Sequence, residues 1–425
     1  MTRTTLLAAP LLVALAAPVL AQNLSPQERA IVAAVDARRE AAIDLLRRAV
    51  DIPSATENHE GVRRLGELFA GELRELGFES RWVEMPGEIG RSGHLVAEHR
   101  GTVGRRLLLI GHLDTVLQGE PFRRDGDRAF GSGASDMKSG DVIILEALRA
   151  LHQAGALSDR QVIVVMTGDE EDTGKPYSVS RAALVDAAKR SDVALAFEGY
   201  EPGTAVIGRR GFSSWRLEVA GSQGHSSGIF GEARGSGAVF EAARILSAFH
   251  DELREPYLTY NPSVIVGGAD VTYDPATFTG TATGKTNVVS RAVVVEGDMR
   301  FLSRDQLLRA REKMQAIVAR HLPRTTASIA FTDGMPSMAP TDGSRALMTL
   351  IDQCSRDLGA GPLVPHDPSQ RGAGDISFVA DVVPGLDGLG GLGVNEHAPG
   401  EYVQLDAMPL LTKRAALLMH RLGAM

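Results

Sequence analysis

Histidine and carboxylate side chains recur along this chain in five short clusters, and these are the groups that bind divalent metals such as zinc. Each cluster has an ordinary explanation when taken alone, because a His-x-Asp is often a turn feature and an acidic run is often a solvated turn. The clusters are His112-Leu-Asp114, Asp136, Asp169-Glu170-Glu171-Asp172, Glu198 and His397. Their joint occurrence, each beside an expected strand, helix or glycine-rich stretch, indicates a site for a pair of metal ions.

Three apolar runs predict the strands that must position these clusters. Residues 107–110, 162–165 and 193–197 are β-prone and lack polar alternation. This pattern is typical of strands covered on both faces, as in a largely parallel α/β sheet with helices on either side. In such sheets ligands bind outside the carboxyl ends of the strands, and one cluster directly follows each of the three runs. We therefore expect these clusters to meet at one edge of the sheet.

The pattern changes after residue 207. Residues 212–219 alternate polar and apolar, which suits a half-solvated antiparallel strand. A helix (236–253), two strands (263–266, 288–299), a helix (304–322) and a strand (327–331) follow, in the β-α-β-β-α-β order of a ferredoxin-like domain.

Helices of the first style lie on both sides of this stretch, at 25–50, 62–76, 140–153 and 179–190 before it and at 344–358 and 407–422 after it. We therefore expect a catalytic domain in two parts, 22–207 and 334–425, interrupted by an inserted α+β domain at 208–333.

The N-terminus has the composition of a secretory signal. Arg3 precedes an uncharged apolar run of about 15 residues, and small or compact residues end it at Ala21. An uncleaved anchor is the alternative, but this run contains two prolines and is short for a span of about 20 residues. We expect residues 1–21 to be removed and the protein to be periplasmic or secreted, without stable membrane insertion.

Composition excludes several classes of protein. With 425 residues, 44% hydrophobic and 23% charged, the chain is an ordinary globular protein with room for two or three domains. A net charge of -8 and only 5% aromatic residues argue against nucleic acid as a partner. The single cysteine, Cys354, allows no internal disulfide and no cysteine-ligated metal cluster.

The sequence resembles the co-catalytic zinc exopeptidases and deacylases, a family that includes glutamate carboxypeptidase, aminoacylase, acetylornithine deacetylase and succinyl-diaminopimelate desuccinylase. The resemblance covers almost the whole mature chain. Its motifs are Gly111-His112-Leu-Asp114-Thr-Val, Gly131-x-Gly133-x-x-Asp136-Met-Lys, Asp169-Glu170-Glu171, Glu198, Gly224-His225-Ser, Thr286-Asn287-Val-Val, Asp298-Met-Arg300 and His397-Ala-Pro.

The resemblance implies a role for each residue of the metal clusters. Asp136 would bridge two zinc ions, which cobalt or manganese could replace. One ion would take His112 and Glu198, and the other Glu171 and His397. Asp114 would accept the other N–H of the His112 ring and hold its orientation. Glu170 would be the general base, because a reading in which both adjacent glutamates bind metal leaves no obvious base in the motif.

The resemblance also implies that the inserted domain acts as a lid and forms a homodimer. His225 would then stabilise the oxyanion, often in the neighbouring subunit, while Asn287 and Arg300 would hold the substrate and its carboxylate. A histidine in a polar turn and an arginine at a strand edge are also often merely exposed. Residues 226–235 depart from many relatives, since they lack a proline and form a longer segment.

These inferences predict an exported dinuclear zinc hydrolase that cleaves an amide or peptide bond next to a free carboxylate, as a carboxypeptidase does. The expected substrates are small peptides or N-acyl amino acids. An aminoacylase or dipeptidase is the alternative within the family, because the motifs describe the metal chemistry and not the side-chain pocket. An exported, non-catalytic solute-binding protein is a further alternative, against which Glu170 argues, since a binding protein needs no base.

Overall fold

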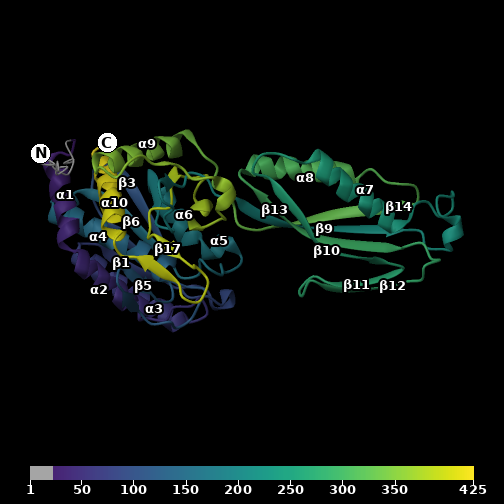
Figure 1. Cartoon of the computed structure of the whole chain (residues 1–425), viewed down its shortest axis with the longest axis horizontal. Helices are drawn as coiled ribbons and strands as arrows, with labels where there is room; N and C mark the ends of the chain where they lie inside the picture. Colours follow the sequence, from purple (N-terminus) through teal and green to yellow (C-terminus); the bar gives the residue numbers. More distant parts are fainter. Residues whose placement is uncertain (1–22) are drawn as a thin grey trace, which may run out of the picture.

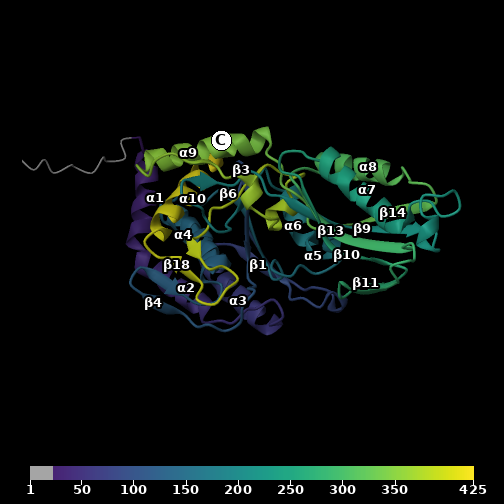
Figure 2. The same cartoon turned by 45° about the vertical axis from the view of Figure 1, so that its right-hand side comes forward.

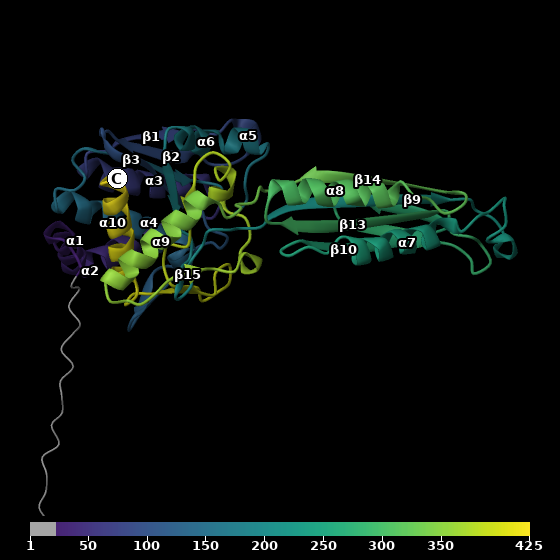
Figure 3. The same ribbon diagram turned by 90° about the horizontal axis from the view of Figure 1, so that it is seen from above.

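The computed structural model describes residues 23–425, so the predicted signal at 1–21 lies outside the described residues. The chain forms two bodies that lie end to end (Figures 1 and 3). One contains a six-stranded sheet and the other a four-stranded sheet. Among residues 23–425 no helix combines the length and the apolar character that a membrane span requires.

The six-stranded sheet has the order β1-β2-β6-β3-β7-β16, in which β6, β3, β7 and β16 run parallel and β2 pairs antiparallel with both β1 and β6. This confirms the predicted, largely parallel α/β sheet. Its strands are β1 (Glu79–Val83), β2 (His94–His99), β3 (Val103–His112), β6 (Arg160–Thr167), β7 (Val193–Ala196) and β16 (Gly385–Leu386).

Both faces of this sheet are covered, as the apolar runs predict. Leu107 and Leu109 of β3 point into one core, which contains residues of the helices α1, α2, α3, α4, α9 and α10. Leu108 and Ile110 point into the opposite core, beneath α6 and the 3-10 turn at Asp375–Phe378. The helices are α1 (Pro26–Ala37), α2 (Arg39–Val50), α3 (His59–Glu75), α4 (Ser139–Gln153), α5 (Tyr177–Ser180), α6 (Ala182–Lys189), α9 (Asp342–Asp357) and α10 (Met408–Gly423).

The structure divides two of the expected helices. The helix predicted over 25–50 is two helices, which meet at Arg38, and α1 begins with a capping box between Ser25 and Glu28. The helix predicted over 179–190 is α5 followed by α6, with Arg181 between them.

The second body has the ferredoxin-like arrangement that the element order predicts. Its sheet order is β10-β13-β9-β14, with every neighbouring pair antiparallel. Helices α7 (Gly237–Glu252) and α8 (Arg304–Val318) cover one face and share a core with the strands. The strands are β9 (Gly211–Gly221), β10 (Thr259–Gly268), β13 (Ala292–Phe301) and β14 (Thr325–Asp333).

The sequence prediction missed a hairpin on the other face of this sheet. Strands β11 (Asp270–Asp274) and β12 (Thr279–Thr283) pair antiparallel and lie on the side away from α7 and α8 (Figures 1 and 2). The guanidinium of Arg216 on β9 stacks on the Tyr273 ring at 5.8 Å, which ties the hairpin to the sheet. Most of its residues are exposed, so no apolar run marked these strands.

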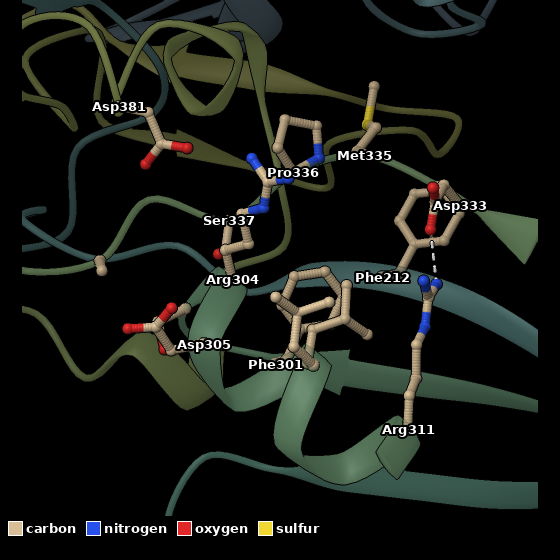
Figure 4. A pocket seen from close by; sticks show the side chains of 15 residues that line it. Phe212, Phe301, Arg304, Asp305, Arg311, Asp333, Met335, Pro336, Ser337 and Asp381 are labelled. Atoms are coloured by element: carbon tan, nitrogen blue, oxygen red, sulfur yellow. Dashed lines mark hydrogen bonds and ion pairs between the residues drawn. The ribbon is translucent and has the colours of Figure 1, made fainter. Parts of the chain in front are cut away.

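Two adjacent segments join the bodies. Arg209 and Met338 exchange backbone hydrogen bonds of 2.9 Å, and the Phe212 N–H donates to the Met335 carbonyl at 3.1 Å. A cavity of about 560 Å³ lies at this junction, where Arg311 donates to Asp333 (Figure 4). None of the predicted site residues lines this cavity, so it is separate from the candidate site.

Two further short sheets complete the described chain. In the larger one, β17 (Gly393–Val394), β18 (Tyr402–Gln404), β5 (Arg128–Phe130) and β4 (Arg123–Asp125) are antiparallel neighbours. The smaller one pairs β15 (Val364–Pro365) with β8 (Thr204–Ala205). The larger sheet brings the C-terminal segment beside the strand that leads to Asp136.

Candidate metal centre

The carboxyl ends of three parallel strands deliver the first residues of the site. His112 is the last residue of β3, and Glu198 follows β7 by two residues. Glu170 and Glu171 follow β6 by three and four residues. Because β3, β6 and β7 are parallel neighbours, these side chains reach the same edge of the sheet.

Two loops bring in the remaining predicted ligands. Asp136 lies in the tight turn Ala134–Lys138, which follows Gly133 in a left-handed conformation with φ of 74°. His397 lies between β17 and β18 and also has a positive φ, of 62°. The two side chains meet although 261 residues of sequence separate them.

The Asp136 carboxylate lies between the two histidines. Its Oδ1 is 3.1 Å from Nε2 of His112, and its Oδ2 is 2.9 Å from Nε2 of His397. Glu171 Oε2 lies 3.0 Å from the same atom of His397. Glu198 Oε1 lies 3.9 Å from Nε2 of His112. The five side chains thus form two sets that share Asp136.

The donor set fits divalent metals. Ligand atoms of His112, Asp136 and Glu171 all lie within 4.8 Å of one another, as do those of His112, Glu170 and Glu198. Glu171 Oε1 is buried without a hydrogen-bond partner in the described chain, as a ligand atom would be. Imidazole and carboxylate donors at this spacing are the ligands that zinc takes in hydrolases.

Crowding of acids shifts the ionisation of the site. Burial raises the pKa of Glu198 to about 8, and hydrogen bonds to Asp136 and Glu171 raise the pKa of His397 to about 11. Both groups therefore hold protons at neutral pH in the metal-free protein. A metal ion would take the place of these protons, since ligands bind in their deprotonated forms.

Asp114 differs from its expected contact. The His112 Nδ1 lies 3.0 Å from the Asp114 backbone carbonyl, whereas the nearest carboxylate oxygen is 3.6 Å away. The carboxylate instead accepts bonds from the Thr56 hydroxyl at 2.7 Å and from the N–H groups of Glu170 and Glu171 at 2.9 and 3.1 Å. Asp114 therefore orients the histidine through its backbone and fixes the glutamate turn through its side chain.

Comparison with known proteins identifies the family of this chain. The family model of peptidase family M20/M25/M40 matches residues 108–421, which hold all of the predicted ligands. The chain belongs to the M20 family. Membership of this family agrees with the mostly parallel sheet with an inserted domain, and it makes the chain a member of a metallopeptidase family.

Individual M20 relatives match along most of the chain. Carboxypeptidase G2 of Pseudomonas sp. (strain RS-16) is 25% identical over 90% of both chains. A succinyl-diaminopimelate desuccinylase of Cupriavidus necator is 27% identical over 85% of this chain and 93% of its own. In structure, aminopeptidase PepT of Bacillus cereus has a TM-score of 0.71 over 90% of this chain and 98% of its own, at 16% identity. The chain is therefore an M20-type metallohydrolase.

Sequence reasoning missed a buried ion-pair network behind the M20 glutamates. The Arg181 guanidinium, 1% exposed, contacts Asp169 at 2.5 Å and Asp375 at 2.7 Å. Asp169 also accepts bonds from Ser180 and from the Gly174 N–H, so the network holds both ends of the segment that carries Glu170 and Glu171. Asp375 lies 206 residues after Asp169, and no local signal in the sequence joins them.

A second buried arginine lies close to Glu170. Arg209 pairs with Asp387 at 2.6 Å, and both side chains are buried. A Cβ at Gly374 would lie 2.2 Å from the Arg209 guanidinium and 3.5 Å from Glu170 Oε1, so a side chain there would displace this arginine from beside Glu170. Arg209 thus brings a positive charge to a strongly acidic site, and the sequence predicted no role for it.

Three predicted residues lie outside the centre. One end of the β9–β13 pair points away from the catalytic domain (Figure 1). His225 follows β9 at this end, and Asn287 precedes β13 there. The Ser226 N–H donates to the Asn287 carbonyl at 2.9 Å, so the two segments are neighbours. β9 has 11 residues, which puts its far end roughly 30 Å from the junction. Arg300 lies near the junction, where it bonds Asp298 at 3.1 Å.

Proposed function

We propose that this chain is an exported, dinuclear zinc hydrolase that cleaves an amide or peptide bond next to a free carboxylate. Its substrates would be small peptides or N-acyl amino acids, and its action carboxypeptidase-like. The position of Asp136, with one carboxylate oxygen toward each histidine, carries this proposal. The similarity to a carboxypeptidase over 90% of both chains supports the reaction class.

When bound, two zinc ions would lower the pKa of the attacking water and polarise the scissile carbonyl. His112, Glu198, Glu171 and His397 would hold them in two sets about Asp136. Glu170 then takes the proton of the attacking water and passes it to the leaving nitrogen. In the metal-free site, burial and the negative charge of Glu198 raise the pKa of the Glu170 carboxyl well above its ordinary value.

The substrate contacts come from the inserted domain in this proposal. The His225 turn lies too far from the centre of its own chain, which supports a role in the partner subunit of a homodimer. His225 would donate to the oxyanion there, and Asn287, its neighbour, would help to hold the substrate. Arg300 would exchange its exposed contact with Asp298 for the substrate carboxylate.

An aminoacylase or dipeptidase remains the second candidate. The similarity to a desuccinylase at 27% identity favours an N-acyl amino acid substrate. These enzymes would share the metal centre and differ in the side-chain pocket, so a substrate panel separates them.

Metal analysis combined with such a panel tests the proposal. Purified protein is assayed on dipeptides and N-acyl amino acids before and after chelation, and after zinc is returned. We expect two metals per chain, loss of hydrolysis on chelation and recovery with zinc. Fewer than two metals at full occupancy, or activity that survives chelation, would refute the dinuclear centre. N-terminal sequencing of the exported protein tests the signal, with residue 22 expected first.

A further inference from the structure

A buried carboxylate accepts several hydrogen bonds from the loop that carries Asp136. Glu401 is only 4% exposed. Its Oε1 accepts the backbone N–H groups of Ser135 at 2.8 Å and Asp136 at 2.9 Å, and its Oε2 accepts that of Gly133 at 2.9 Å. Three donors of one turn thus converge on one side chain, in the manner of an anion bound by successive backbone N–H groups.

Strand pairing puts Glu401 at this place. β18 pairs with β5 so that Tyr402 lies opposite Phe130, and the Gly131 N–H donates to the Glu401 carbonyl at 3.2 Å. Within the turn, the N–H groups of Ala134 and Lys138 donate to the carbonyls of Gly131 and Gly133. The N–H groups of Gly133, Ser135 and Asp136 donate instead to Glu401. A buried donor without a partner costs about 1–3 kcal/mol.

Glu401 also links two ligands that are distant in the sequence. It lies four residues after His397, whose Nε2 is 2.9 Å from Asp136 Oδ2. The same segment therefore supplies one ligand and holds the backbone of another. No ion pair to the Glu401 carboxylate forms in residues 23–425, although the buried Lys138 ammonium is near enough to interact with it. The negative charge of Glu401 adds to that of Asp136. Two dications would balance this charge.

We propose that Glu401 is a positioning residue of the metal centre. By holding the N–H groups of residues 133–136, it aims the two oxygens of the Asp136 carboxylate at the two metal positions. The inference rests on the proposed dinuclear centre, and it predicts that the occupancy of that centre depends on a side chain that touches neither metal.

Glu401→Gln tests this role with almost no change of shape. The amide oxygen can still accept two of the bonds, but the NH₂ group would face the Gly133 N–H, donor against donor. Zinc is titrated into the metal-free protein by calorimetry, and the melting temperature of the metal-free form is recorded. We expect the zinc affinity to fall roughly 10–100-fold, as for other groups that orient metal ligands, with a fall in kcat and little change in KM.

Ser135→Ala is the matched control. It removes a hydroxyl of the same loop, which donates to Glu396, and leaves the three backbone donors in place. We expect its zinc affinity to stay within about twofold of the original protein, because the bonds to Glu401 persist. An affinity loss as large as that of Glu401→Gln would overturn the specific role of Glu401.

The outcomes separate positioning from simple support of the fold. Wild-type zinc affinity in Glu401→Gln, or a lower melting temperature with unchanged affinity, would overturn the proposal. If Glu401→Gln does not fold, Glu401→Asp takes its place, because it keeps the charge and cannot span all three donors. Unchanged zinc affinity in Glu401→Asp would also overturn the proposal. If the original protein binds zinc but hydrolyses no substrate, the proposed function fails and the titration still decides the role of Glu401.

Discussion

Two adjacent glutamates at the end of β6 have different surroundings. Glu171 contacts the ring of His397 at 3.0 Å and leaves its second oxygen without a partner. Within the described chain Glu170 forms no ion pair with a histidine, although one of its oxygens lies within 4.8 Å of ligand atoms of His112 and Glu198. Its Oε1 lies near Gly374 and the Arg209 guanidinium. Asp114 accepts the backbone N–H of both residues, so one turn presents the proposed ligand and the proposed base side by side.

Glu170→Gln should therefore lose catalysis and keep metal. The amide cannot take a proton from water, and removal of a general base costs about 10²–10⁴-fold in rate. Glu171→Gln should instead lower the metal content, because it changes a ligand. Turnover and metal per chain are measured for both. Near-normal hydrolysis by Glu170→Gln would remove it as the base.

At the scale of elements, the start of α4 carries an acid without a partner. Asp141 lies in the first turn of α4 and is fully buried, and neither carboxylate oxygen has a hydrogen bond within the described residues. A Cβ at Gly111 would come within 2.1 Å of its Oδ1, so only glycine fits before His112. Burial raises the pKa of Asp141 well above its ordinary value.

Asp141→Asn should stabilise the protein at high pH. Because the pKa of Asp141 is higher in the folded than in the unfolded state, ionisation opposes folding, and this penalty grows as the pH rises above the unfolded value near 4. The neutral amide avoids the penalty, so we expect a gain of about 1–2 kcal/mol at pH 8 and little gain at pH 4.5. Melting temperatures at both pH values measure it.

Asp305→Asn provides the control, since Asp305 occupies the first turn of α8 and is exposed. Its substitution should change the melting temperature little at either pH. An equal effect of both substitutions would mean that burial is not the cause.

The elements that the sequence predicted are those with a local signal. Continuous apolar runs located β3, β6 and β7, and with them the positions of His112 and Glu198. The sequence did not predict the hairpin β11–β12, because its residues are mostly exposed and rich in threonine. The sequence did not predict roles for Arg181, Arg209 and Glu401, for another reason. Each contacts a partner that is distant in the sequence, and only the folded chain brings the two together.

At the scale of the whole molecule, the metal centre and the His225 turn lie in different bodies of one chain. A mixed dimer tests whether His225 acts on the partner. Chains with Glu170→Gln and with His225→Ala, each tagged differently, are co-expressed and the mixed dimer is purified. One site would then combine an intact Glu170 with an intact His225, so we expect about half of the wild-type activity per dimer.

Each variant alone should be nearly inactive. If His225 served its own chain, the mixed dimer would have no complete site and would be as inactive as its parents. If the mixed dimer is no more active than its parents, His225 does not act in the partner subunit. It would then act within its own chain or have no catalytic role.

The paired segments at the junction have a consequence for how the molecule unfolds. The chain enters and leaves the inserted domain at the same place, and the cores of the two bodies share no residue. Each body can therefore unfold while the other stays folded, so we do not expect the whole chain to unfold in a single two-state transition. The sequence contains two tryptophans: Trp82 packs against the catalytic core, and Trp215 is buried in the inserted domain.

Fluorescence of Trp82→Phe and Trp215→Phe during urea denaturation should give curves with different midpoints, one for each body. Coincident curves would mean that the junction makes the whole chain unfold as one cooperative unit. With one indole in each body, the order in which the two bodies unfold can be read from intrinsic emission alone.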